Sequence, residues 1–327
     1  MPGVRPPANE APPPQEPGGW QGEARLDFAV RQGRTTFQGG TSAPFKVMRA
    51  QHLEDGRCEL PLLHTAGGLV GGDQLSLLTR HGEDSRATIT SVAAQKVYGT
   101  IGRCRRQPHG AWARQTLHAR LERGADVEWL PQELVLFANG LLEQHTRVEL
   151  APGASWLGAE VVRLGRTAAG EGLAAGRWRS RLDICRRLDA EQQWRWEVAD
   201  RLELAGATLH DPHGMGGEPV FGSLVWVGPG RLEKATLDAL VSQCRGAREG
   251  LAGEMACGAL ETGVVARYRG PSTTAARWWF TRIWAAVRSV RQLPPPTLPR
   301  VWPFQEDPLG TMADRERDRR GATISPS

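Results

Sequence analysis

The segment LLHTAGGLVGGDQL, Leu62–Leu75, places four glycines between two apolar, strand-like runs. Glycine has no Cβ and takes positive φ without steric cost, so two Gly-Gly pairs let the chain turn sharply and approach another backbone closely. The glycines are Gly67, Gly68, Gly71 and Gly72, and Asp73 follows them. The segment therefore predicts a glycine-built turn between two strands.

The same segment lacks the features of a nucleotide-binding loop. A Walker A loop carries Lys and then Ser or Thr after its last glycine, whereas Gly72 is followed by Asp73 and Gln74. A dinucleotide-binding fingerprint opens a helix, but the residues after Gln74 alternate like a strand and contain no helix start signal. We therefore do not expect a nucleotide site here.

Five segments together resemble the urease accessory protein UreD family, called UreH in some organisms. The glycine segment resembles the hallmark of that family, whose usual form has Pro-Pro where this chain has Thr65 and Ala66. The other four are similar to further family motifs and follow in the family's order, namely Gln95–Tyr98, Glu128–Glu133 (EWLPQE), Leu164–Glu171 (LGRTAAGE) and Val265–Tyr268. Losing two prolines removes two fixed φ angles, so we expect a looser loop unless Thr65 bonds locally.

The resemblance implies a β-rich fold with two helices and a non-enzymatic nickel-delivery chaperone. Its implied partners are apo-urease and the accessory protein UreF, which recruits the GTPase UreG that brings nickel. In the family the acidic residues of two motifs line an internal nickel route, which carries over to Asp73 and Glu171. The remaining motif positions are Gly67, Gly68, Gly71, Gly72, Lys96, Tyr98, Pro131, Gln132, Glu133, Gly165 and Arg166.

Composition limits the class of protein. With 327 residues and 40% hydrophobic content the chain can bury a sizeable core, in one domain or in two. It has no run of eighteen apolar residues and no basic-then-apolar N-terminal signal, so we expect a cytoplasmic protein that neither enters a membrane nor is exported. Five cysteines without a CxxC pair argue against a disulfide framework or a zinc ribbon and predict small buried hydrophobes.

The charge and the tryptophans favour protein partners. The net charge of +5 comes mostly from arginine, but no arginine cluster carries a nucleic-acid-binding motif. Arginine and tryptophan, of which there are 12, are enriched at protein interfaces. We expect docking onto acidic protein partners and no nucleic-acid binding.

The chain divides by composition into a proline-rich disordered leader (1–20), a single UreD-like β-rich domain (21–304) and a mobile charged tail (305–327). Three units in the domain repeat a strand, a glycine turn and a second strand, at Leu78–Ser91, Leu117–Leu130 and Val148–Val161. Such hairpin-like units predict a layered, solenoid-like β architecture in which each unit stacks on the next.

Helical periodicity is persuasive only near the C-terminus, at Leu232–Arg245 and Ser272–Leu293. The second segment has an apolar stripe with its arginines away from it, which suggests a polar arginine face and, with the tail, a docking surface. The expected fold is therefore mostly β with two late helices.

Several polar residues are candidates for metal chemistry. His64 and Asp73 flank the glycine turn; they either satisfy backbone groups of the loop or flank a passage for a divalent ion, since imidazole and carboxylate suit nickel. Glu133 and Glu160 are weaker candidates of the same kind, the alternative being buried carboxylates neutralised by arginine. His210 and His213 lie in a Gly/Pro loop and are more typical of a solvated segment.

We predict a non-enzymatic urease maturation factor that acts as scaffold and nickel conduit. Asp73, Glu171 and His64 would line the passage, nickel would bind transiently, and no cofactor would be held tightly, because three or four ideal ligands would trap the ion. A β-rich hydrolase using Asp73 with Glu133 or Glu171 is one alternative, although no nucleophile or metalloprotease motif supports it. A metal-independent interaction module is the other.

Overall fold

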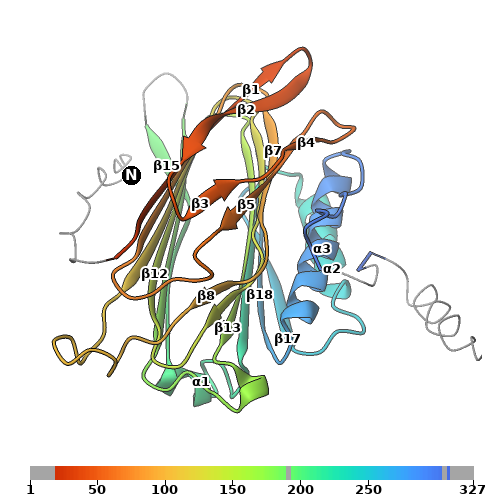
Figure 1. Cartoon of the computed structure of the whole chain (residues 1–327). Coiled ribbons are helices and arrows are strands. Elements are labelled where there is room, and N and C mark those ends of the chain that lie inside the picture. The colour runs from red at the N-terminus through yellow and green to blue at the C-terminus, as the bar shows by residue number, and fades with distance from the viewer. Residues whose placement is uncertain (1–18, 189–192, 304–307, 310–327) are drawn as a thin grey trace, which may run out of the picture.

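Two β-sheets face each other in the computed structural model, which describes residues 19–188, 193–303 and 308–309 (Figure 1). In these ranges the first sheet, sheet A, has seven strands in the order β15-β14-β12-β9-β6-β1-β2. Their bounds are β1 Gln21–Arg31, β2 Arg34–Thr41, β6 Gln74–His81, β9 Ala113–Leu121, β12 Leu141–Leu150, β14 Arg177–Arg187 and β15 Trp194–Ala205.

The second sheet, sheet B, has eleven strands in the described ranges, with β17-β18-β16-β13-β10-β7-β5-β3 as its main path. Their bounds are β3 Phe45–Val47, β4 Gln51–His52, β5 Cys58–His64, β7 Arg86–Ser91, β8 Gln95–Val97, β10 Asp126–Leu130, β11 Leu134–Leu136, β13 Ser155–Leu164, β16 Val220–Val227, β17 Glu254–Leu260 and β18 Gly263–Gly270. Two longer helices, α2 (Lys234–Gly246) and α3 (Thr273–Val290), cover the outer face of sheet B (Figure 1). A short helix, α1 (Gly206–His210), follows β15.

The chain alternates between the sheets as it passes along the molecule. From β5 it steps to β6, β7, β9, β10, β12, β13 and β14, so that successive strands of each sheet lie parallel and in register. The prediction of a layered, solenoid-like β fold with two late helices is therefore confirmed. The units are not hairpins, however, because the strands on either side of Gly82, Gly124 and Gly153 lie in different sheets and do not pair with each other.

The apolar side of helix α3 packs as its sequence pattern predicts. Ser272 caps the helix by accepting a hydrogen bond from Ala275 N at 3.2 Å, and the apolar stripe packs against sheet B and α2. The prediction of an exposed arginine face on this helix is wrong. Arg277 and Arg288 are buried, and Arg282 donates to backbone carbonyls of Ala247 and Glu249.

Acidic side chains of β10 and of two adjoining loops explain why Arg277 and Arg288 turn inward. Arg288 binds Glu128 at 3.0 Å and Asp55 at 2.6 Å, and Arg277 binds Glu133 at 2.6 Å. Buried carboxylates need a partner of opposite charge, since an unpaired buried charge is costly. The helix therefore supplies charges as well as apolar surface.

Arg57 stands at the centre of this buried charge cluster. Its guanidinium is fully buried, pairs with Asp126, and donates to Ala87 O at 3.1 Å. Burial alone would raise the pKa of Asp126, yet Arg57 and Arg291 hold that pKa well below its usual range. Asp126 is thus a charged group that joins β10 to α3.

Four of the five cysteines are buried as predicted, and Cys104 is exposed. The predicted leader and tail lie outside the described residues, apart from Gly19, Trp20, Pro308 and Leu309, and the single-domain organisation stays a prediction. Within the described ranges, no helix has the length and apolar character that crossing a membrane requires.

Removing the Arg57 charge should cost much of the stability. We expect Arg57→Met to lower the free energy of unfolding by about 3 to 5 kcal/mol, because it leaves buried carboxylates unpaired. The matched control is Arg25→Met, whose exposed pair with Glu23 should contribute no more than about 0.5 kcal/mol. Urea unfolding at pH 7 measures both, and equal effects of the two substitutions would contradict a structural role for the cluster.

Candidate functional site

The glycine segment forms the predicted turn between β5 and β6. Gly67, Gly68 and Gly72 have positive φ, which glycine adopts without strain. At Gly68 a Cβ would also lie 2.6 Å from the Tyr98 ring. Gly71 has ordinary φ, but a Cβ there would lie 2.4 Å from the carbonyl oxygen of Ala111. The four glycines therefore serve both the turn and its close packing.

Asp73 is buried and holds this turn together. Its carboxylate accepts hydrogen bonds from the backbone N–H of Val70 and of Trp20, each at 2.8 Å. Thr65, which stands where the family has proline, bonds Pro44 O through its N–H at 2.8 Å and its hydroxyl at 3.0 Å. The local bond that would keep this loop firm is thus present.

His64 lies near Asp73 and is only partly satisfied. Within the described residues its Nε2 is buried without a hydrogen-bond partner. Burial lowers the pKa of His64, and the nearby Asp73 carboxylate partly offsets that effect. A neutral imidazole with an unshared nitrogen is the form that can accept a proton or ligate a metal.

Other motif segments meet at the same end of the molecule. Leu69 N donates to Lys96 O at 2.7 Å, and the Tyr98 and Phe137 rings lie 5.1 Å apart. The Arg166 guanidinium lies 4.5 Å from the centre of the Phe137 ring and donates to Glu171 at 2.8 Å. These contacts join segments that are far apart in sequence.

Both oxygens of the Glu171 carboxylate accept hydrogen bonds at this end of the structure. Its Oε1 accepts a hydrogen bond from Ala138 N at 2.7 Å, and its other oxygen accepts from Arg166. The Arg166 hydrogen bond lowers the pKa of Glu171. Glu133, a carboxylate of the Glu128–Glu133 motif, does not join this group of contacts. It pairs with Arg277 of α3, the helix that covers the outer face of sheet B.

A band of polar side chains crosses the space between the two sheets. Gln115, Gln144 and Ser180 are direct neighbours across β9, β12 and β14, and Glu160 and Ser223 are neighbours across β13 and β16. We call these five residues the polar band. On β9, β14 and β16 the inward residues directly before and after the band belong to two different apolar clusters, and on β12 and β13 the same two clusters are reached beyond Thr146 and Gly158. The band therefore separates two dry parts of the core.

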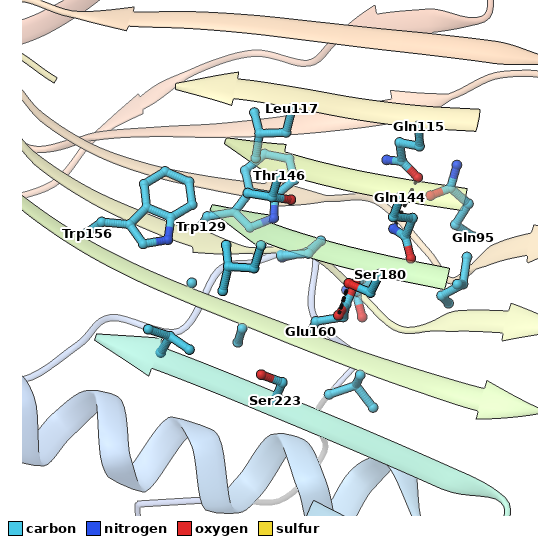
Figure 2. Close-up of a pocket in the computed structure, with 18 residues that line it drawn as sticks. Gln95, Gln115, Leu117, Trp129, Gln144, Thr146, Trp156, Glu160, Ser180 and Ser223 are labelled. Carbon is cyan, nitrogen blue, oxygen red and sulfur yellow. Dashed lines mark hydrogen bonds between the residues drawn. The ribbon is translucent and has the colours of Figure 1, made fainter. Parts of the chain in front are cut away.

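The polar band lines a partly open cavity of about 90 Å³ between the sheets, together with Trp129 and Trp156 (Figure 2). Figure 2 shows Ser180 and Glu160 pointing toward each other, and Ser180 Oγ donates to Glu160 Oε2 at 3.3 Å. Gln144 Nε2 donates to Gln115 Oε1 at 3.5 Å. A polar space of this volume has room for several water molecules.

Glu160 is the carboxylate of this cavity. Burial raises its pKa from 4.5 to about 7, although Ser180 and Arg267 act in the opposite direction, and Asp200 raises it further. Glu160 therefore keeps its proton to higher pH than an ordinary carboxyl does. A divalent cation that reaches Glu160 would displace its proton and meet a full negative charge.

Sequence reasoning placed Glu160 second to Asp73 and Glu171 and did not single out Gln115, Gln144, Ser180 or Ser223. Gln115 and Gln144 do occupy the same inward position of successive units, which is a signal that alignment of the repeats would have revealed. Among the described residues, no group of three or more His, Cys, Asp and Glu side chains is arranged to hold a metal ion. The band offers one carboxylate with neutral oxygens around it.

Replacing the cavity carboxylate should change how stability depends on pH. The raised pKa means that folded Glu160 holds a proton which the unfolded chain releases, so its contribution to stability falls as pH rises from about 4.5 to about 7. We expect Glu160→Gln to be more stable than the unsubstituted protein at pH 8 by about 1 to 3 kcal/mol and similar to it at pH 4.5.

Urea unfolding at several pH values measures this effect. Glu143→Gln is the control, because Glu143 is a half-exposed carboxylate on β12 that pairs with Arg114. A difference between Glu160→Gln and the unsubstituted protein that stays constant across the pH range would contradict the raised pKa.

Comparison with known proteins identifies the family. A family model described as UreD urease accessory protein matches residues 21–303. A urease accessory protein UreD of Synechococcus sp. (strain WH7805) is 57% identical over 296 residues, covering 89% of this chain and 93% of its own length. One from Prochlorococcus marinus (strain MIT 9313) is 51% identical over 316 residues, covering 94% and 98%. The chain therefore belongs to the UreD urease accessory protein family.

Proposed function

We propose that this chain is a non-enzymatic urease maturation factor that passes nickel through its interior to apo-urease. The observation that carries the proposal is the polar band, which places Glu160 and neutral oxygens along a cavity between two apolar clusters. Membership of the UreD family supports a role in urease maturation.

The ligand chemistry of the polar band suits a metal ion that passes through and does not stay bound. A bare divalent ion in an apolar interior would be very unfavourable, so a route needs polar atoms and water. Amide and hydroxyl oxygens with one carboxylate are fewer and weaker ligands than a closed metal site provides. An ion would therefore be stabilised in transit without being trapped.

Asp73, Glu171 and His64 remain proposed parts of the passage. His64 Nε2, which has no hydrogen-bond partner among the described residues, would be the atom that meets a passing ion. The carboxylates of Asp73 and Glu171 are occupied by backbone N–H groups, and Glu171 also by Arg166, so each would have to exchange a hydrogen bond for the ion. For these two residues, ion passage requires a local opening of the end of the molecule that contains the Leu62–Leu75 segment, which we call the glycine-segment end.

The proposed partners are apo-urease on one side and UreF on the other, with UreF recruiting the nickel-bearing GTPase UreG. In this scheme the chain is a cytoplasmic scaffold as well as a conduit. Exposed Tyr98 and Val70 and the arginine-rich loop after Gly102 give the glycine-segment end the apolar and basic character that an acidic protein surface would complement.

Nickel loading of urease in cells tests the proposal. A urease operon would be expressed with this chain intact, deleted, or carrying Glu160→Gln, Asp73→Ala or the control Glu143→Gln. We expect deletion to give inactive, nickel-poor urease. Glu160→Gln should lower nickel content roughly tenfold at limiting nickel while the accessory complex still assembles, because removing a charge beside the ion changes its energy by more than about 1 kcal/mol.

Asp73→Ala should lower nickel content as well, and Glu143→Gln should have no effect. Urease activity and metal analysis of the purified enzyme provide the readout, and co-purification reports assembly. If deletion leaves urease fully active, the maturation role is wrong. If deletion abolishes activity but Glu160→Gln loads normally, the chain acts as a metal-independent scaffold instead of a conduit. Substrate turnover by the isolated chain would favour the hydrolase alternative.

A further inference from the structure

An ion pair bridges the two sheets at one margin of the cavity. Arg267 on β18 is the neighbour of Ser223, which in turn is the neighbour of Glu160, so the three form one inward row of sheet B. The Arg267 guanidinium donates to Ser223 Oγ and to the carboxylate of Asp200, which lies on β15, the edge strand of sheet A. The contact thus spans the gap between the sheets.

This ion pair lies between the cavity and solvent. The side chains of Arg267 and Asp200 are 34% and 35% exposed, whereas Ser223, which Arg267 contacts, is 9% exposed and lines the cavity. The Phe221 ring lies 5.9 Å from the guanidinium and borders it on the apolar side. Polar contacts therefore run without a break from Ser223 to the surface through Arg267.

We propose that the Arg267–Asp200 pair is a lateral barrier that keeps cations from crossing the margin between β15 and β18. The guanidinium is the member of the pair that contacts the cavity residue Ser223, so a cation passing Ser223 would meet the positive end of the pair first and be repelled, whereas a neutral molecule would not. Asp200 anchors the guanidinium across the gap, and Ser223 orients it. The inference rests on the proposed nickel route, because the barrier would confine an ion near Glu160 to that route.

A bridge that served only to hold the sheets together would not distinguish a cation from a neutral molecule. Charge selectivity is therefore the property to measure, and a reactive thiol in the cavity can report it. Ser180→Cys places a thiol of nearly the same size as the native hydroxyl beside Glu160. Cys104→Ser removes the exposed native thiol, and the other four cysteines are buried.

The experiment compares two thiol reagents on the full-length chain. Cationic ethylammonium methanethiosulfonate and neutral methyl methanethiosulfonate would each be applied, and mass spectrometry of the peptide containing position 180 gives both rates. With Arg267 in place we expect a low ratio of cationic to neutral rate. Arg267→Gln should raise that ratio at least about tenfold, as expected for removing a unit charge close to the path.

Two further variants separate the effect of the Arg267 charge from the effect of physically closing the margin between β15 and β18. Asp200→Asn keeps the positive charge but loses its anchor, so the neutral reagent should react faster while the ratio stays low. Arg179→Gln is the matched control, because Arg179 is next to the reporter but pairs with exposed Glu203 and stacks on Trp112. This substitution should leave the ratio unchanged.

An unchanged ratio in Arg267→Gln, or an equal rise in Arg179→Gln, would overturn the barrier. Circular dichroism checks folding, and if Arg267→Gln does not fold, Arg267→Lys decides instead: a low ratio with a faster neutral rate supports the barrier, and a raised ratio rejects it. The assay uses neither urease nor nickel, so its failure would leave the nickel-loading result standing, and the reverse also holds.

Discussion

Parallel stacking in register is the constraint on which this structure depends. Because successive strands of each sheet pair without a shift, each inward position of one unit lies beside the same inward position of the next. Apolar positions then build continuous clusters, and a polar position repeated in neighbouring units builds a continuous polar row. The core and the sheet-A half of the polar band are thus two results of one register, whereas Glu160 and Ser223 meet through the antiparallel pairing of β13 and β16.

Carboxylates on the two faces of sheet B differ in how completely they are paired with positive charge. Its outer face carries buried carboxylates that Arg57, Arg288 and Arg291 neutralise, which fixes α3 against the sheet. Its inner face carries Glu160, which bonds the neutral Ser180 hydroxyl and whose pKa is raised by burial. A fully paired carboxylate serves as a structural element, whereas an incompletely paired one stays available to an incoming cation.

The motif residues of the glycine-segment end are mostly explained by structure. Glycines provide the turn and the close approach, Asp73 satisfies two backbone N–H groups, and Arg166 packs on Phe137 while it binds Glu171. His64 is the exception, since its buried nitrogen has no partner in the described ranges. A conduit that used this end would depend on the same hydrogen bonds that shape it, which couples any ion passage there to loop motion.

The sequence by itself determined the strands, the glycine turn, the two late helices and the family, because these depend on local periodicity, on φ preferences and on motifs that lie within short segments. It also predicted that repeated units stack. Only the tertiary structure decided that each unit spans two sheets, that Arg277 and Arg288 of α3 turn inward, and that Gln115, Gln144, Ser180, Glu160 and Ser223 meet in one cavity. The physical reason is that pairing register and charge neutralisation join residues separated by tens of positions, and local pattern carries no information about which of them will meet.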